Sequence, residues 1–189
     1  MKETFSVLAG FLSIIAYVPY IRAIVKGYTK PAKASWIIWA SIDTITFYGM
    51  YIEDTLNGQI IATVIGVWLI AALALKYGSR GWTKIDKSCL GGTVLSILLW
   101  QMFNSPTLGI VASVSAGSIG SIPTCAAAWN DPGRENKLAW TIFFVSCVLT
   151  VIAMPHWTWA DATQPISFLV IGITMMYILY LRPRLLIAA

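Results

Sequence analysis

Charged residues are scarce in this sequence. Eight acidic and thirteen basic side chains make up 11% of its 189 residues, and there is one histidine. Soluble proteins carry charges on about a quarter of their residues, so this composition does not make a water-exposed surface. The hydrophobic share of 58% and the mean hydropathy of +0.74 indicate an integral membrane protein instead.

The sequence also lacks the motifs of familiar catalytic sites. It contains no nucleophile elbow, no phosphate-binding loop and no paired carboxylates, so we predict no enzyme and no catalytic residue. Its three cysteines, Cys89, Cys125 and Cys147, fall in or beside apolar runs. An odd number of such cysteines, without clustered histidine or acidic residues, predicts neither a disulfide framework nor a metal site. No cofactor is expected.

Seven apolar runs follow one another with short linkers between them. A helix needs about 20 apolar residues to cross the hydrocarbon layer, and the runs lie at residues 5–25, 34–52, 59–77, 89–104, 107–128, 137–154 and 165–182. They do not alternate with period two, which favours a helical bundle over a β-barrel. We therefore predict an all-α membrane protein with seven transmembrane helices. The first run exceeds a signal-peptide core and lacks a small-residue cleavage site, so we expect it to be retained.

The basic residues predict the orientation of the chain, because cytoplasmic loops are enriched in Lys and Arg. If the seven helices alternate in direction, Lys2 lies alone on one side. The other twelve basic residues lie on the opposite side: Arg22, Lys26, Lys30, Lys33, Lys76, Arg80, Lys84, Lys87, Arg134, Lys137, Arg182 and Arg184. We therefore expect a multi-pass protein of a bacterial or archaeal plasma membrane, with the amino terminus outside and the carboxyl terminus in the cytoplasm.

Two stretches that lie 104 residues apart resemble each other. Residues 18–36 read VPYIRAIVKGYTKPAKASW and residues 122–140 read IPTCAAAWNDPGRENKLAW. Within these two stretches, four pairs of positions are identical: Pro19 and Pro123, Ala23 and Ala127, Lys33 and Lys137, and Trp36 and Trp140. Together with the alternating spans, these pairs predict a 3+1+3 parallel repeat of three-helix bundles. Residues 1–77 and 107–189 form the two repeats, and residues 78–106 carry a connecting helix.

In these two stretches and in its helix order, the chain resembles the PQ-loop superfamily of SWEET-like transporters. The family's Pro-Gln pair appears here as Pro19-Tyr20 and Pro123-Thr124, so both prolines match and both glutamines are absent. The resemblance implies a seven-helix transporter that moves a small polar metabolite, such as a sugar, an amino acid or a vitamin-like solute, by alternating access. A ligand-sensing or sorting receptor on the same fold, without transport, is the alternative.

Pro19 and Pro123 are predicted to be gating hinges near the cytoplasmic ends of the first and fifth helices. A proline inside a helix removes a hydrogen bond and displaces the carbonyl four residues earlier. Two hinges in equivalent positions would let an inner gate open and close. Static kinks that shape the bundle are the alternative interpretation.

Asp43 is the one acidic residue near the middle of a predicted span. A charge at that depth costs about 2.5–3.5 kcal/mol on insertion scales, so such residues usually face an interior or wet cavity and have a function. We predict that Asp43 binds a coupling proton or a cationic part of the solute. A structural hydrogen bond to a serine or threonine of a neighbouring helix is the alternative. At the 104-residue spacing its mate is Cys147, which we also predict to be a solute-binding or proton-coupling residue, so the halves differ chemically here.

The other predicted solute-binding residues follow from their positions in the spans. Trp39 and Phe47 share a helix face with Asp43, because three or four residues separate them. Trp68 lies in the middle of the third span, and Thr174 is a polar residue of the last span. For Trp39, a place in the aromatic belt at the membrane interface fits equally well.

Residues 155–165 are predicted to form an outer loop, in which His156 belongs either to a pH-sensitive lid or to a segment resting in the membrane interface. The expected partners of the protein are the lipid bilayer and a small-molecule solute, with a homo-oligomer left open. Nucleic acid is not expected, because the basic residues are scattered over the ends of helices.

Overall fold

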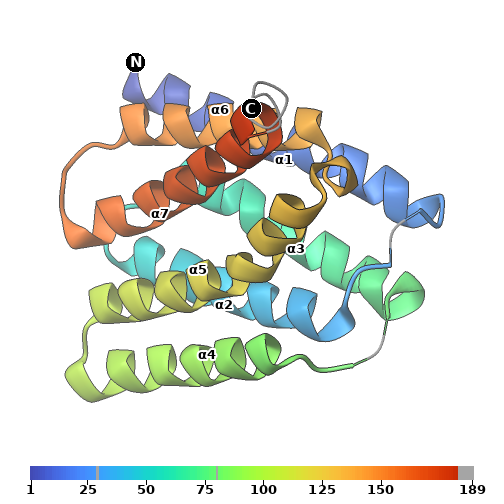
Figure 1. The fold of residues 1–189 in the computed structure, drawn as a ribbon. Helices are drawn as coiled ribbons and strands as arrows, with labels where there is room; N and C mark the ends of the chain where they lie inside the picture. The colour runs from blue at the N-terminus through green and yellow to red at the C-terminus, as the bar shows by residue number, and fades with distance from the viewer. Residues whose placement is uncertain (29, 80, 183–189) are drawn as a thin grey trace.

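The computed structural model describes residues 1–28, 30–79 and 81–182, and these residues form helices joined by short loops (Figure 1). The helices are α1 (Lys2–Val25), α2 (Lys33–Ile52), α3 (Gly58–Tyr77), α4 (Lys84–Phe103), α5 (Pro106–Asn130), α6 (Lys137–Ala153) and α7 (Trp159–Met176). A 3-10 turn, η1 (Pro132–Arg134), precedes α6, and a π-helical segment, η2 (Tyr177–Leu181), extends α7. The described residues contain no β-strand, so the predicted all-α fold with seven helices is confirmed.

The starts of two helices differ from the prediction because polar residues cap them. Helix α4 begins at Lys84, before the apolar run at 89, because Thr83 and Asp86 form a capping box that satisfies the first amide groups. Helix α7 begins at Trp159, because the Thr158 side chain accepts a hydrogen bond from the amide of Asp161. Much of the predicted outer loop is therefore helix, and Pro165 lies inside α7.

The helices pack in a regular order. Helix α3 lies between α1 and α2, and helix α7 lies between α5 and α6. These two groups meet along two seams, one where α1 packs on α6 and one where α2 packs on α5. Helix α4 packs on α5 and, less extensively, on α2, at the edge of the bundle (Figure 1).

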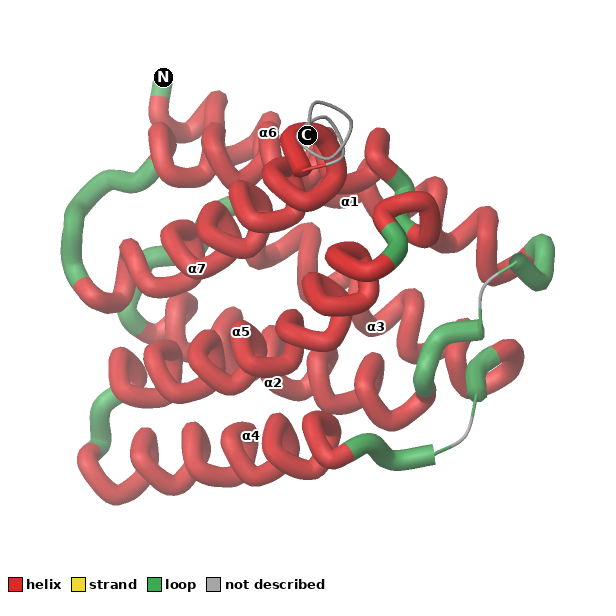
Figure 2. Tube along the Cα trace, in the orientation of Figure 1, coloured by secondary structure: helices red, strands yellow, loops and turns green. Residues whose placement is uncertain are grey.

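The loops gather at opposite ends of the bundle, as the tube in Figure 2 shows. The amino terminus and the α2–α3, α4–α5 and α6–α7 loops lie together at one end, where the Lys2 ammonium donates to the carbonyl of Met154 at 3.0 Å. We call this end the vestibule end. The α1–α2 and α3–α4 loops meet at the opposite end through a bridge between Ala32 and Ser79. We call that end the basic end.

Four helical segments are long and apolar enough to cross a membrane: α1, α3, α5, and α7 continued to Leu181. Helix α6 is apolar and shorter, with 17 residues. Large apolar side chains such as Phe11, Ile65 and Leu98 are half-exposed or more on the outside of the bundle. Because a water-soluble protein rarely exposes so many of them together, these features indicate a membrane protein.

Candidate functional site

The Asp43 carboxylate lies in the interior of the bundle without a partner. Protein atoms surround it densely, and its side chain is half-buried. None of the described residues forms a hydrogen bond or an ion pair with it. The structural hydrogen bond to a neighbouring serine or threonine, which the sequence left open, is therefore not formed within the described residues.

Two hydroxyl groups from other helices accompany Asp43. The phenol of Tyr17, on α1, lies within electrostatic reach of the Asp43 carboxylate. Thr63, on α3, lies beside that phenol, and its side chain is 4% exposed. The Thr63 hydroxyl is nevertheless the buried side-chain polar atom that finds no hydrogen bond of good geometry among the described residues. Asp43, Tyr17 and Thr63 therefore form a cluster, the central site, in which polar groups from α1, α2 and α3 converge.

Gly66 allows Tyr17 to reach the central site. A β-carbon built on Gly66 would lie 2.2 Å from a ring carbon of Tyr17, well inside van der Waals contact. The ring therefore rests on the backbone of α3, one turn after Thr63. Any larger residue at this position would displace the phenol from Asp43.

Trp39 and Phe47 flank Asp43 along α2 and turn toward the second group of helices. Trp39 packs beside Ile42 and Ala116, and its indole nitrogen lies close to Gly120 of α5. Phe47 packs against a buried apolar cluster with members from α2, α3, α5 and α7. Both side chains therefore line the seam between α2 and α5, above and below Asp43.

Two predicted site residues point outward. The Trp68 side chain is 47% exposed, and its indole donates to the Thr44 hydroxyl at 2.9 Å. Thr174 is exposed and donates to the carbonyl of Val170 in its own helix. The structure thus brings neither side chain into the central site.

Cys147, the mate of Asp43, belongs to a separate buried network. Its thiol accepts a hydrogen bond from the amide of Gln59 at 3.3 Å, and the same amide group donates to Ser146 at 3.0 Å. Ser146 in turn bonds the hydroxyl of Ser13 at 2.7 Å and the carbonyl of Ala9 at 2.8 Å. The side-chain amide of Gln164 donates to Gln59 at 3.1 Å.

These side chains join α1 and α3 to α6 and α7, and we call the group the amide network. Helices α1, α3 and α7 contribute Ser13, Gln59 and Gln164 to it. All three are fully buried. The sequence prediction did not include this network. The signal for it was weak, because Gln59 is the first residue of the apolar run 59–77 and Gln164 directly precedes the run 165–182. A buried glutamine nevertheless needs a partner.

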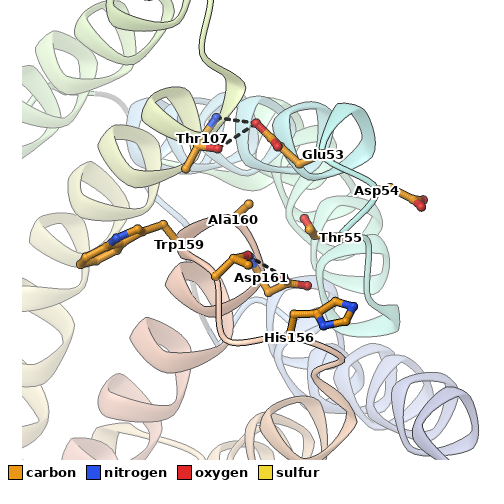
Figure 3. A pocket seen from close by; sticks show the side chains of 9 residues that line it. Glu53, Asp54, Thr55, Thr107, His156, Trp159, Ala160 and Asp161 are labelled. Atoms are coloured by element: carbon orange, nitrogen blue, oxygen red, sulfur yellow. Dashed lines mark hydrogen bonds between the residues drawn. The ribbon is translucent and has the colours of Figure 1, made fainter.

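A hollow opens at the vestibule end of the bundle (Figure 3). It has a volume of about 530 Å³ and is lined by the α2–α3 loop, the start of α5, the α6–α7 loop and the start of α7. Three of its lining residues are acidic, namely Glu53, Asp54 and Asp161, and His156 lies at its rim. We call this hollow the vestibule. Among the described residues, no group of three histidine, cysteine or acidic side chains is arranged to hold a metal ion.

Two of the three acidic residues also cap helices. The Glu53 carboxylate accepts hydrogen bonds from the amide and the hydroxyl of Thr107, at 3.1 and 2.8 Å, near the start of α5. Asp161 accepts a bond from the Thr158 hydroxyl at 2.5 Å. Asp54 has no such role and is exposed. Its φ of 54° is in the left-handed region, which Asp and Asn adopt more readily than most residues.

A buried apolar layer separates the vestibule from the central site. It consists of Met50, Ile60, Ile110, Val114 and Ala160, with Phe47 and Leu56 packed against it. Along α2, Asp43 and Glu53 are about 15 Å apart at a rise of 1.5 Å per residue, and Phe47 and Met50 lie between them. Ala160 belongs both to the layer and to the vestibule lining. We call this layer the apolar seal.

Pro19 and Pro123, the two predicted hinges, both lie within helices. Pro19 interrupts the hydrogen bonding of α1 near its end, and Pro123 falls within the bounds of α5, although its side chain is outside the described residues. Near Pro19, the rings of Tyr20 and Trp36 lie 5.3 Å apart, and those of Trp36 and Trp39 are also 5.3 Å apart. Aromatic packing therefore lies next to the first predicted hinge in the sequence.

No protein-family model, no curated protein and no solved structure matches this chain.

Proposed function

We propose that this protein is a carrier in which two similar groups of three helices move a small polar solute across the membrane by alternating access. The observation that carries the proposal is the Asp43 carboxylate, which is unpaired in the middle of the bundle and separated from the vestibule by the apolar seal. An acidic residue inside the membrane without a partner is by default a functional residue, because a purely structural role would require a partner for its charge.

The packing order supports a repeat of two three-helix units. If α1, α2 and α3 are exchanged with α5, α6 and α7 in that order, each contact between two of these six helices corresponds to another observed contact. The α1–α3 contact becomes α5–α7, the α2–α3 contact becomes α6–α7, and the α1–α6 seam becomes the α2–α5 seam. Helix α4 is outside this exchange, as expected for a connecting helix. This symmetry favours the division into residues 1–77, 78–106 and 107–189, and with it the resemblance to PQ-loop carriers.

Buried residues at the 104-residue spacing support the same repeat. Thr46 and Thr150 are identical, and each is 1% exposed. Met50 and Met154 are also identical and buried. Thr46 and Met50 lie in the second half of α2, and Thr150 and Met154 lie at the end of α6 and directly after it. The exchange described above pairs these two helices.

The charge distribution supports an orientation with the vestibule outside. Lys2 lies at the vestibule end, whereas Lys33 and Lys76 lie at the basic end with most of the other Lys and Arg residues. Arg80 and Arg184, which contribute to the predicted bias, lie outside the described residues. By the positive-inside rule the basic end faces the cytoplasm, and the cell envelope of a bacterium or archaeon remains the proposed location.

In the proposed cycle, solute enters the vestibule, passes the apolar seal as the seams between the two units loosen, and reaches Asp43. Bending at Pro19 and Pro123 would then open the basic end while the seal closes. When no solute is bound, a proton would bind the Asp43 carboxylate, since a neutral carboxyl group costs less free energy in the interior than a charged one. Proton-coupled exchange follows from this competition for one carboxylate.

Uptake into proteoliposomes tests the carrier proposal. The purified chain would be reconstituted, and saturable entry of labelled sugars, amino acids, amines and vitamins would be measured at two pH values against protein-free vesicles. We expect saturable flux of one solute class. Binding without flux would favour the receptor alternative, and absence of flux for every class would contradict the proposal.

A further inference from the structure

We infer that the central site selects an organic cation, with an ammonium or guanidinium group at Asp43 and the hydroxyls of Tyr17 and Thr63 as hydrogen-bond acceptors. This inference rests on the proposed carrier function and names its solute class. It depends on the charges of the central site, the unpaired hydroxyl of Thr63, and the composition of the vestibule.

The first observation is that the central site has one negative charge and no positive one. Tyr17, Asp43 and Thr63 supply a phenol, a carboxylate and an alcohol, and no described Lys, Arg or His forms an ion pair with Asp43. The basic side chains whose bonds are known lie at the helix ends, where Lys2 and Lys33 donate to backbone carbonyls of Met154 and Leu75. A cation would supply the missing charge, whereas an anion would be repelled.

The second observation is the buried hydroxyl of Thr63. Buried polar atoms nearly always have a hydrogen-bond partner, so an unpaired one calls for an explanation such as a ligand. Thr63 adjoins the Tyr17 phenol, which in turn lies within electrostatic reach of Asp43. A group that donates two or more hydrogen bonds and carries a positive charge would satisfy all three side chains together.

The third observation is the sign of charge in the vestibule. Glu53, Asp54 and Asp161 line it, and no Lys or Arg does. A cleft of one charge sign with low-dielectric walls concentrates ions of the opposite sign and speeds their arrival. The entrance and the central site therefore have the same electrostatic preference, although the apolar seal separates them.

The amide groups argue against a sugar. Sugars are recognised by several polar side chains that donate and accept at once, and amides are well suited to this. In this chain Asn57, Gln59 and Gln164 bond one another, since Asn57 donates to Gln164 at 2.8 Å and Gln164 donates to Gln59 at 3.1 Å. They are therefore occupied within the amide network and are not part of the central site.

Binding to the full chain in nanodiscs tests this inference, with probes that differ in charge. The cations are choline and agmatine, the neutral probes are glucose and 3,3-dimethyl-1-butanol, which has the shape of choline without its charge, and the anion is glutamate. Isothermal titration would give the affinities. We expect agmatine, which carries a positive charge and N–H donors, to bind at least roughly tenfold more tightly than every neutral or anionic probe. Choline carries the charge without an N–H donor, so it should bind more weakly than agmatine.

Variants locate the binding. Asp43→Asn should weaken cation binding by roughly tenfold or more, because it removes the charge. Thr63→Val is nearly isosteric and removes no hydrogen bond of good geometry, so the fold should be kept while the affinity of agmatine, which has N–H donors, falls about three- to tenfold. Thr174→Val removes an exposed hydroxyl that bonds its own helix, and it should leave every affinity unchanged.

Two results would overturn the inference: agmatine does not bind, or Asp43→Asn binds agmatine as tightly as the native chain does. Its failure can be told apart from failure of the carrier proposal. Saturable glucose uptake with no cation binding would remove the cation site and keep the carrier. Cation binding that depends on Asp43, with no flux of any solute, would keep the cation site and remove the carrier.

Discussion

The Gln164 side chain of α7 donates to the Gln59 side chain of α3 at 3.1 Å, and both side chains are fully buried. This bond joins residues 105 positions apart and connects the group of α1, α2 and α3 to the group of α5, α6 and α7. The α1–α6 side of the bundle is therefore held by a continuous polar network. The α2–α5 seam has a smaller counterpart, the bond between the Thr46 and Ser113 hydroxyls at 2.8 Å.

Replacing Gln59 with leucine should destabilise the protein by about 1–3 kcal/mol, because Gln164, Ser146 and Cys147 all lose a partner while remaining buried. Thermal unfolding in detergent would measure the change. Gln101→Leu is the matched control, since Gln101 is an exposed glutamine on α4, and it should have little effect. Equal stability of the two variants would show that the amide network does not hold the units together.

Replacing Gly66 with alanine should also destabilise the protein, by about 1–3 kcal/mol, because the new methyl group would overlap the Tyr17 ring. Solute affinity should fall as well, since the phenol must leave Asp43. Gly91→Ala is the control: nothing lies within 4 Å of the added carbon on α4, and alanine favours a helix. If Gly66→Ala kept native stability and affinity, Tyr17 would not belong to the site.

Asp54→Asn should slow the arrival of a cationic solute without disturbing the fold, because asparagine also adopts the left-handed conformation found at this position. We expect the apparent affinity for agmatine to fall roughly two- to threefold at about 0.01 M salt. The difference from the native chain should vanish at about 1 M salt, where charges are screened within about 3 Å. A difference that persists at high salt would mean that Asp54 acts by direct contact.

Asp86, at the start of α4, should make stability depend on pH in the acid range. Its burial favours the neutral form, but hydrogen bonds from Ser35 and from the hydroxyl and amide of Thr83 outweigh this and lower the pKa of the carboxyl group. A lowered pKa in the folded state adds stability that is complete above the unfolded value of about 3.9 and is lost as pH falls through the folded value.

The difference in stability between the native chain and the Asp86→Asn variant should therefore shrink as pH falls below about 4. Thermal unfolding between neutral and acid pH would show this, with Asp54→Asn as a control at an exposed position. A difference in stability that stays constant across this pH range would show that protonation of Asp86 is not linked to folding.

The sequence predicted the number and order of the helices well, because long apolar runs are separated by polar linkers. It placed the starts of α4 and α7 too late, since Thr83 and Thr158 extend those helices through capping bonds that hydropathy does not register. It singled out Asp43 for a physical reason, the cost of an unpaired charge in an apolar span. That Asp43 has no protein partner could be learned only from the structure.

Whether an individual side chain points into or out of the bundle was harder to predict. Helix α3 is apolar on every side, so its sequence gave no sign that Trp68 points outward while Thr63 points inward. Gln59 and Gln164 were overlooked because each lies near a helix start, where a polar residue is ordinary. Their pairing depends on how α3 approaches α6 and α7, which local patterns do not determine.

Cross-linking the α2–α5 seam tests the central claim most directly. Thr46→Cys and Ser113→Cys would be combined in a chain whose three native cysteines are replaced by alanine, because the two hydroxyl oxygens lie 2.8 Å apart across the seam. Uptake by proteoliposomes would be measured before oxidation, after oxidation and after reduction, with each single variant as a control. Alternating access predicts that the disulfide abolishes uptake and that reduction restores it. Full uptake by the cross-linked protein would contradict movement of the two units against each other.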